Sequence, residues 1–171
     1  MKCAGNPCGS RHFAGEWRVG VRTALIFFFV ITVLFTSGCQ KSERLVLESA
    51  GYPERVLELR QDRVFSLKYT HSVEKTPVIE TFQAQGNSTL LLISTKYKSY
   101  GVGLPSLPQE GKLTVADGWL TLEGLQREFR DLRVRVGPEA GVILEIGRDI
   151  YPLHEWYPPG SLVRIRQENL K

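Results

Sequence analysis

Residues 113–122 read LTVADGWLTL, and this stretch decides the fold class of the chain. Apolar and polar residues alternate on both sides of Asp117-Gly118, as they do in half-buried strands. An Asp-Gly pair between two such runs is a strong hairpin signal, because a tight hairpin turn needs residues that tolerate a positive φ. The stretch therefore predicts two antiparallel strands joined by a two-residue turn.

Short strand-like runs continue on both sides of this hairpin. They are rich in β-branched residues, they repeat about every ten residues, and turn residues such as Gly86-Asn87 and Gly137-Pro138 separate them. Regular short strands predict an all-β chain, folded as a single-domain β-sandwich or barrel-like domain of antiparallel strands. The predicted strands lie at residues 44–48, 55–59, 64–69, 78–82, 88–95, 113–115, 119–122, 132–136, 142–146 and 162–166.

One segment carries a competing signal. Four apolar residues recur at helical spacing between residues 122 and 132, which predicts a short helix over 123–130. Gly124 counts against that helix, because glycine is a poor helix former. The sequence leaves both alternatives open here.

The composition is that of an ordinary globular protein. Of the 171 residues, 42% are hydrophobic and 23% are charged, which excludes a disordered or collagen-like chain and suits one domain. The formal net charge is +4, but it falls to +1 without the first 38 residues, which hold four basic residues and one acidic residue. The basic character therefore belongs to the N-terminal segment, and the sequence predicts no nucleic-acid partner.

The N-terminal segment has the features of an export signal. Residues 23–38 carry no charge and follow Arg18 and Arg22. A permanent transmembrane helix needs roughly 20 apolar residues, so this shorter run suits the apolar part of a signal peptide better. It runs into Thr36-Ser-Gly-Cys39, which resembles the bacterial lipobox. That resemblance implies that a diacylglycerol is attached to Cys39 and that the chain is cleaved before it.

We therefore expect three parts: a signal peptide or membrane anchor at 1–38, a lipidated Cys39 with a tether to residue 43, and an exported β domain at 44–171. An uncleaved single-pass anchor is the alternative to the lipoprotein. In both cases the basic residues before the apolar run hold the N-terminus inside. The domain is then expected in the cell envelope, anchored to a membrane and facing the periplasm or the cell exterior.

The densest cluster of reactive side chains lies at residues 69–82. It holds one imidazole and two carboxylates, His71, Glu74 and Glu80, which could bind a ligand or act in general acid–base catalysis. The plainer alternative is a polar turn between two strands, whose side chains bond to the local backbone.

A second candidate lies at residues 97–105. Lys98 and Tyr100 precede Gly101 and Gly103, whose backbone amides could hold an anion together with the lysine. The alternative is a tight loop between packing tyrosines, since a lone G-x-G lacks the strand–turn–helix setting of a nucleotide-binding loop.

A third candidate, residues 149–159, interleaves aromatic residues with prolines around His154. Such a stretch lines a groove or caps the open end of a β core. His71 and His154 are the only histidines after residue 39, and their spacing from nearby carboxylates selects no metal. The sequence therefore predicts neither a metal nor another cofactor.

These motifs resemble an uncharacterised bacterial family, domain of unknown function 1850. The similarity covers roughly residues 60–137 and is densest between residues 71 and 105. The residues that carry it are His71-Ser-Val-Glu74, Thr76-Pro-Val78, Glu80, Phe82, Tyr97, Ser99 and Gly101-Val-Gly-Leu-Pro105. Members of that family are small exported or membrane-anchored proteins, often encoded beside TRAP-type transporters of the TAXI class. The resemblance implies an accessory role in solute uptake and brings no catalytic residues with it.

The sequence thus favours a non-enzymatic envelope lipoprotein that serves as an accessory or binding module, with subunits of a TRAP-type transporter as the expected partner. The candidate binding residues are His71, Glu74, Glu80, Lys98, Tyr100, Gly101 and Gly103. Two alternatives stay open: an envelope hydrolase that uses His71 with Glu74 or Glu80, and a purely structural envelope component. The sequence contains no nucleophile motif such as G-x-S-x-G, which counts against the hydrolase. It does not identify a ligand.

Overall fold

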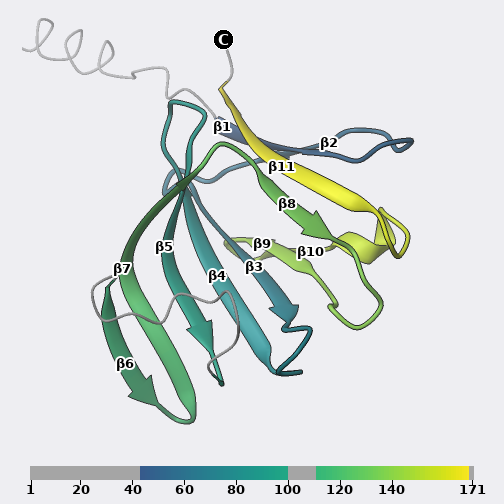
Figure 1. Ribbon diagram of the computed structural model, residues 1–171. Coiled ribbons are helices and arrows are strands. Elements are labelled where there is room, and N and C mark those ends of the chain that lie inside the picture. Colours follow the sequence, from purple (N-terminus) through teal and green to yellow (C-terminus); the bar gives the residue numbers. More distant parts are fainter. Residues whose placement is uncertain (1–42, 100–110, 170–171) are drawn as a thin grey trace, which may run out of the picture. The chain divides into compact units, whose positions relative to one another are not determined.

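A computed structural model describes residues 43–99 and 111–169 (Figure 1). The regular structure in this part of the chain is β, apart from one 3-10 turn at Leu153–Glu155. It confirms the all-β class predicted from the sequence. These residues contain no helix that is long and apolar enough to cross a bilayer. The predicted signal segment and Cys39 lie outside the described residues.

Two antiparallel sheets pack face to face as a sandwich, which decides between the two predicted architectures. The smaller sheet has the order β2 (Arg55–Glu58), β1 (Glu43–Glu48), β11 (Leu162–Asn169) and β8 (Leu132–Arg135). The larger sheet has the order β10 (Asp149–Pro152), β9 (Ile143–Ile146), β3 (Val64–Thr70), β4 (Pro77–Ala84), β5 (Leu90–Tyr97), β7 (Trp119–Phe129) and β6 (Lys112–Ala116).

The core between the sheets follows from the alternation of apolar residues. Leu47 and Ile165 of the smaller sheet and Phe65 and Phe82 of the larger sheet are all buried. The two phenylalanine rings stack with their centroids 5.3 Å apart. Tyr157, also buried, donates its hydroxyl hydrogen bond to the carbonyl of Leu47 at 3.2 Å and so ties the loop before β11 to β1.

The predicted hairpin is confirmed. Strands β6 and β7 pair antiparallel, and the turn between them consists of Asp117 and Gly118. Both residues have a positive φ, 51° and 71°, as a two-residue turn of type I′ requires.

The competing prediction of a helix over 123–130 is wrong, because residues 123–129 belong to strand β7. Leu122 and Leu125 are both buried although Glu123 and Gly124 between them are exposed. Gly124 has a φ of 78°, and the pairing of β7 with β5 shifts in register beside it. A bulge adds residues to one strand and so puts positions i and i+3 on the same face. It therefore imitates helical spacing.

The third candidate stretch caps one end of the β core. Residues 149–155 of this stretch form β10 and the 3-10 turn, and Leu153 and Tyr157 are buried while His154 is exposed. This arrangement supports the capping alternative for these aromatic residues.

The chain leaves the larger sheet at the end of β7 and enters the smaller sheet as β8, with only Arg130 and Asp131 between them (Figure 1). In the smaller sheet β8 is the last strand, and its four residues pair with β11 alone. Its other edge borders a groove whose far wall comes from the larger sheet.

Candidate functional site

The candidate site is a groove that follows the open edge of β8. Three hollows with volumes of about 400, 390 and 300 Å³ succeed one another, and each shares lining residues with the next. We call their union the β8 groove. One wall is the chain from Asp131 to Arg135, and the other comes mainly from β3, β4 and the turn between them. The residues of that second wall used below are Leu67, Tyr69, His71, Glu80 and Phe82.

A turn built around His71 forms one end of the groove. The His71 N–H donates to the carbonyl of Thr76 at 2.8 Å, and the His71 carbonyl accepts from the Lys75 N–H at 2.9 Å. The imidazole Nδ1 accepts hydrogen bonds from the backbone N–H groups of Val73 at 3.3 Å and Glu74 at 3.1 Å. Both contacts use Nδ1 as a hydrogen-bond acceptor, so the turn fixes the orientation of the ring. This geometry supports the polar-turn alternative for His71, although the residue also lines the groove.

The middle of the groove holds a half-buried carboxyl group paired with a phenol. Glu80 faces the sandwich interior from β4, and the Tyr69 hydroxyl of β3 donates a hydrogen bond to it. Burial raises the pKa of Glu80, and the hydrogen bond from Tyr69 and the positive charge of Arg127 offset only part of that rise. Burial also raises the pKa of Tyr69, with a further contribution from the negative charge of Glu80. Both groups therefore keep their protons to a higher pH than they would in water.

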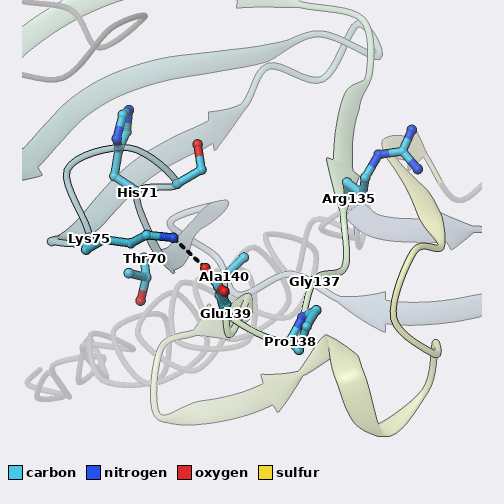
Figure 2. Close-up of a pocket in the computed structure, with 9 residues that line it drawn as sticks. Thr70, His71, Lys75, Arg135, Gly137, Pro138, Glu139 and Ala140 are labelled. Atoms are coloured by element: carbon cyan, nitrogen blue, oxygen red, sulfur yellow. Dashed lines mark hydrogen bonds and ion pairs between the residues drawn. The ribbon is translucent and has the colours of Figure 1, made fainter.

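Cationic side chains line the opposite wall and the end near His71. The guanidinium of Arg135 donates to the carbonyl of Gly160 at 2.9 Å, and the Arg133 Nε lies 3.3 Å from the carboxylate of Asp131. Figure 2 shows the ion pair of Lys75 with Glu139, which links the His71 turn to the loop that follows β8. The hydrogen bond from Lys75 lowers the pKa of the Glu139 carboxyl.

The structure brings together two of the residues predicted from the sequence. His71 and Glu80 line the same hollow. Glu74 accepts a hydrogen bond from the Ser99 hydroxyl at 3.1 Å and does not line the groove. The ammonium of Lys98 lies 5.1 Å from the ring centroid of Trp119, where it makes a cation–π contact, and Lys98 does not line the groove. Tyr100, Gly101 and Gly103 lie outside the described residues.

Sequence reasoning missed three groove residues, Tyr69, Arg133 and Arg135. Tyr69 ends the predicted strand at 64–69 and begins the cluster at 69–82, but nothing in the sequence singles out its hydroxyl. The two arginines lie in the predicted strand at 132–136. The alternation of Arg133 and Arg135 around Val134 was the one available signal, since it puts two cations on one face of a strand.

The described residues hold no cluster of three or more histidine, cysteine, aspartate or glutamate side chains placed to bind a metal ion. The groove offers instead an imidazole, a carboxyl group with a raised pKa, a phenol and two guanidinium groups. Such a set can donate and accept hydrogen bonds and can pair with negative charge.

Comparison with known proteins places the chain in a family. No curated protein and no solved structure matches it. Residues 65–153 match the family model described as a domain of unknown function, DUF1850, and this range contains both walls of the β8 groove. Since the match spans more than half of the chain, this protein belongs to that family.

Proposed function

We propose that this protein is a membrane-anchored envelope lipoprotein that acts as a non-enzymatic binding module, accessory to a TRAP-type solute transporter. The observation that carries the binding role is the β8 groove, an open recess whose two walls present complementary polar groups. Loops and strand ends on a rigid β scaffold are common places for binding residues. The anchoring role rests on the signal segment and Cys39.

The groove suits binding better than catalysis. The Nδ1 atom of His71 is used by two backbone N–H groups, so this atom is not available as a base. The alternative of an envelope hydrolase draws on one observation, the raised pKa of Glu80, because a carboxyl group that stays protonated can act as a general acid. Purified full-length protein assayed on ester, amide and glycoside substrates tests this alternative. Turnover that disappears in Glu80→Gln would favour the hydrolase over the binding module.

The binding proposal is tested by affinity isolation of the full-length protein from membranes of its native host, followed by mass spectrometry. We expect transporter subunits among the recovered proteins and a diacylglycerol on the Cys39 peptide. The variant Arg133→Glu/Arg135→Glu reverses two charges beside the groove and is expected to lose the transporter subunits. Arg148→Glu is the matched control, because Arg148 is exposed and lies outside the groove.

Each part of the proposal can fail separately. An unmodified Cys39 in a chain that still carries residues 1–38 would replace the lipoprotein with an uncleaved anchor. If wild type and Arg133→Glu/Arg135→Glu recover the same proteins, the groove is not the surface that binds them. A preparation without transporter subunits would overturn the accessory role.

A further inference from the structure

Strand β8 presents an unpaired backbone edge to the groove. It pairs with β11 on one side only. The Val136 N–H donates to the carbonyl of Ser161 at 2.9 Å, and the register continues from this pair into β8. Backbone groups of an antiparallel strand point alternately to its two sides. Val134 therefore bonds toward β11, whereas the N–H and C=O groups of Arg133 and Arg135 point toward the groove.

These groups have no partner in the described part of the chain. No backbone hydrogen bond there joins the N–H of Arg133 or Arg135 to another residue. Unpaired strand edges are templates for a further strand, and many proteins protect them with loops, prolines or charges. Here the edge faces a recess bordered by a second sheet.

The recess runs alongside β8, as the binding site of an added strand would have to. Its hollows follow β8 from Asp131 through Val134 to the loop at 137–140. A strand beside β8 would lie about 4.8 Å from it, with alternate side chains pointing toward the larger sheet and toward solvent. Leu67 and Phe82 would meet its inward apolar side chains, and Glu80 with Tyr69 would meet a polar one.

The charges beside this edge indicate which outward side chains an added strand would carry. Arg133 and Arg135 are exposed and sit on the same face of β8, since residues two apart in a strand share a face. An added strand would place its outward side chains beside these arginines, where cross-strand pairs of opposite charge are favourable. Acidic residues at alternate positions therefore complement this edge.

We propose that the β8 groove binds an extended segment of a partner protein, with acidic and apolar residues in alternation, which adds to β8 as a fifth strand of the smaller sheet. This inference rests on the proposed function, because it names the class of partner for the same groove. Backbone hydrogen bonds to Arg133 and Arg135 supply affinity, and the alternating side chains supply specificity.

The probe is the synthetic peptide acetyl-Asp-Val-Asp-Thr-Asp-Val-Asp-amide, added to the full-length protein in phosphatidylcholine nanodiscs. Amide hydrogen exchange is followed by NMR at single residues. We expect the peptide to slow exchange of the Arg133 and Arg135 amides by about tenfold or more and to leave the Val134 amide, which already bonds to β11, almost unchanged. A peptide with lysine in place of aspartate is the charge control and is expected not to bind.

A proline variant tests the backbone bonds separately from the charge. Arg135→Pro and Arg135→Ala both remove the guanidinium, but only proline removes the N–H on the open edge. Proline is tolerated on an edge strand whose N–H faces outward. We expect Arg135→Pro to bind the peptide about tenfold more weakly than Arg135→Ala, as the loss of one hydrogen bond with its packing implies.

Equal affinities of these two variants would overturn strand addition, and so would a peptide that binds without slowing the Arg133 and Arg135 amides. Absence of peptide binding at millimolar concentration would also overturn it. If Arg135→Pro does not fold, the exchange measurement on the wild type still decides. If strand addition fails these tests, the proposed function still holds when wild type recovers transporter subunits and Arg133→Glu/Arg135→Glu does not. If the isolation recovers no transporter subunits but the peptide still binds, the transporter is excluded as the partner, and the groove remains a binding site for an extended segment.

Discussion

The two walls of the β8 groove carry carboxyl groups of opposite character. Glu80, on the wall formed by the larger sheet, is half-buried, and its pKa is raised by desolvation. Asp131, at the start of the β8 wall, is also half-buried, but hydrogen bonds from Arg164 and Arg133 lower its pKa. One wall is part of the core with a polar group set into it, whereas the other is a charged surface on which Asp131 pairs with Arg133 and Arg164 and the Arg135 guanidinium bonds to a backbone carbonyl. A ligand would therefore gain packing from the first wall and backbone hydrogen bonds and charge from the second.

The largest expected difference between the walls is in packing. Phe82 is buried, stacks on Phe65, and meets the ring of Phe129 edge-on with centroids 6.1 Å apart. Phe82→Ala is expected to lower the free energy of unfolding by about 3–5 kcal/mol, because it removes a buried ring and leaves a cavity. Arg133→Ala, on the opposite wall, is expected to cost about 1 kcal/mol or less. Chemical denaturation measures both values, and a loss below about 1.5 kcal/mol for Phe82→Ala would mean that this wall is not core.

The second difference is in the response to pH. A carboxyl group whose folded pKa lies above its unfolded value destabilises the fold as pH rises from the ordinary value of 4.5 through the raised value. Below that window both states bind the proton, and this effect is absent. Glu80→Gln removes the titration and keeps an acceptor for Tyr69, so it is expected to raise the free energy of unfolding at pH 8 by about 1 kcal/mol and to leave it unchanged at pH 4.

The control for Glu80→Gln is Glu58→Gln, the same substitution at an exposed carboxyl group of β2. It is expected to change the unfolding free energy equally little at both pH values. If Glu80→Gln proves less stable than the wild type at pH 8, the ionised carboxylate is stabilising and the pair with Tyr69 has the opposite energetic sign.

Local features of the sequence predicted the larger sheet well. The Asp117-Gly118 turn is a property of two neighbouring residues, and the alternating runs at 64–69 and 78–82 became the adjacent strands β3 and β4. The spacing of Leu122 and Leu125 led to the wrong prediction of a helix over 123–130. A bulge at Gly124 and one turn of helix both put residues three apart on one face.

The groove itself could be predicted only in part. His71 and Glu80 are near in sequence and were identified together, but the wall that faces them comes from β8, far along the chain. That wall depends on which strand ends the smaller sheet and on where the chain crosses between sheets, and both are set by long-range pairing. Lys98 illustrates the same limit, since its neighbour Trp119 lies on β7, a strand that pairs with β5 although β6 lies between them in the sequence.

A smaller effect is expected from the polar atom beside Glu80. Thr95 on β5 is the register partner of Glu80, it is fully buried, and its hydroxyl makes no hydrogen bond to the described residues. Thr95→Val keeps the shape and removes the unpaired hydroxyl, so it is expected to raise the free energy of unfolding by about 1 kcal/mol. Thr114→Val, on an exposed position of β6, is the control and is expected to change little. A destabilised Thr95→Val would show that this hydroxyl has a bonding partner in solution.

The smallest effect is expected at Asp131, on the charged wall. Its pKa in the folded state lies below the ordinary value of 3.8, so its ion pairs stabilise the fold above pH 3.8 and lose that contribution as pH falls through the lowered value. Asp131→Asn is therefore expected to lower the free energy of unfolding at pH 7 by about 0.5 kcal/mol, the usual contribution of a solvent-accessible ion pair, and by less in 1 M salt. Denaturation at both salt concentrations measures this difference. A loss that is larger than about 1.5 kcal/mol and independent of salt would show that Asp131 is part of the packed core, and the contrast between the two walls would then disappear.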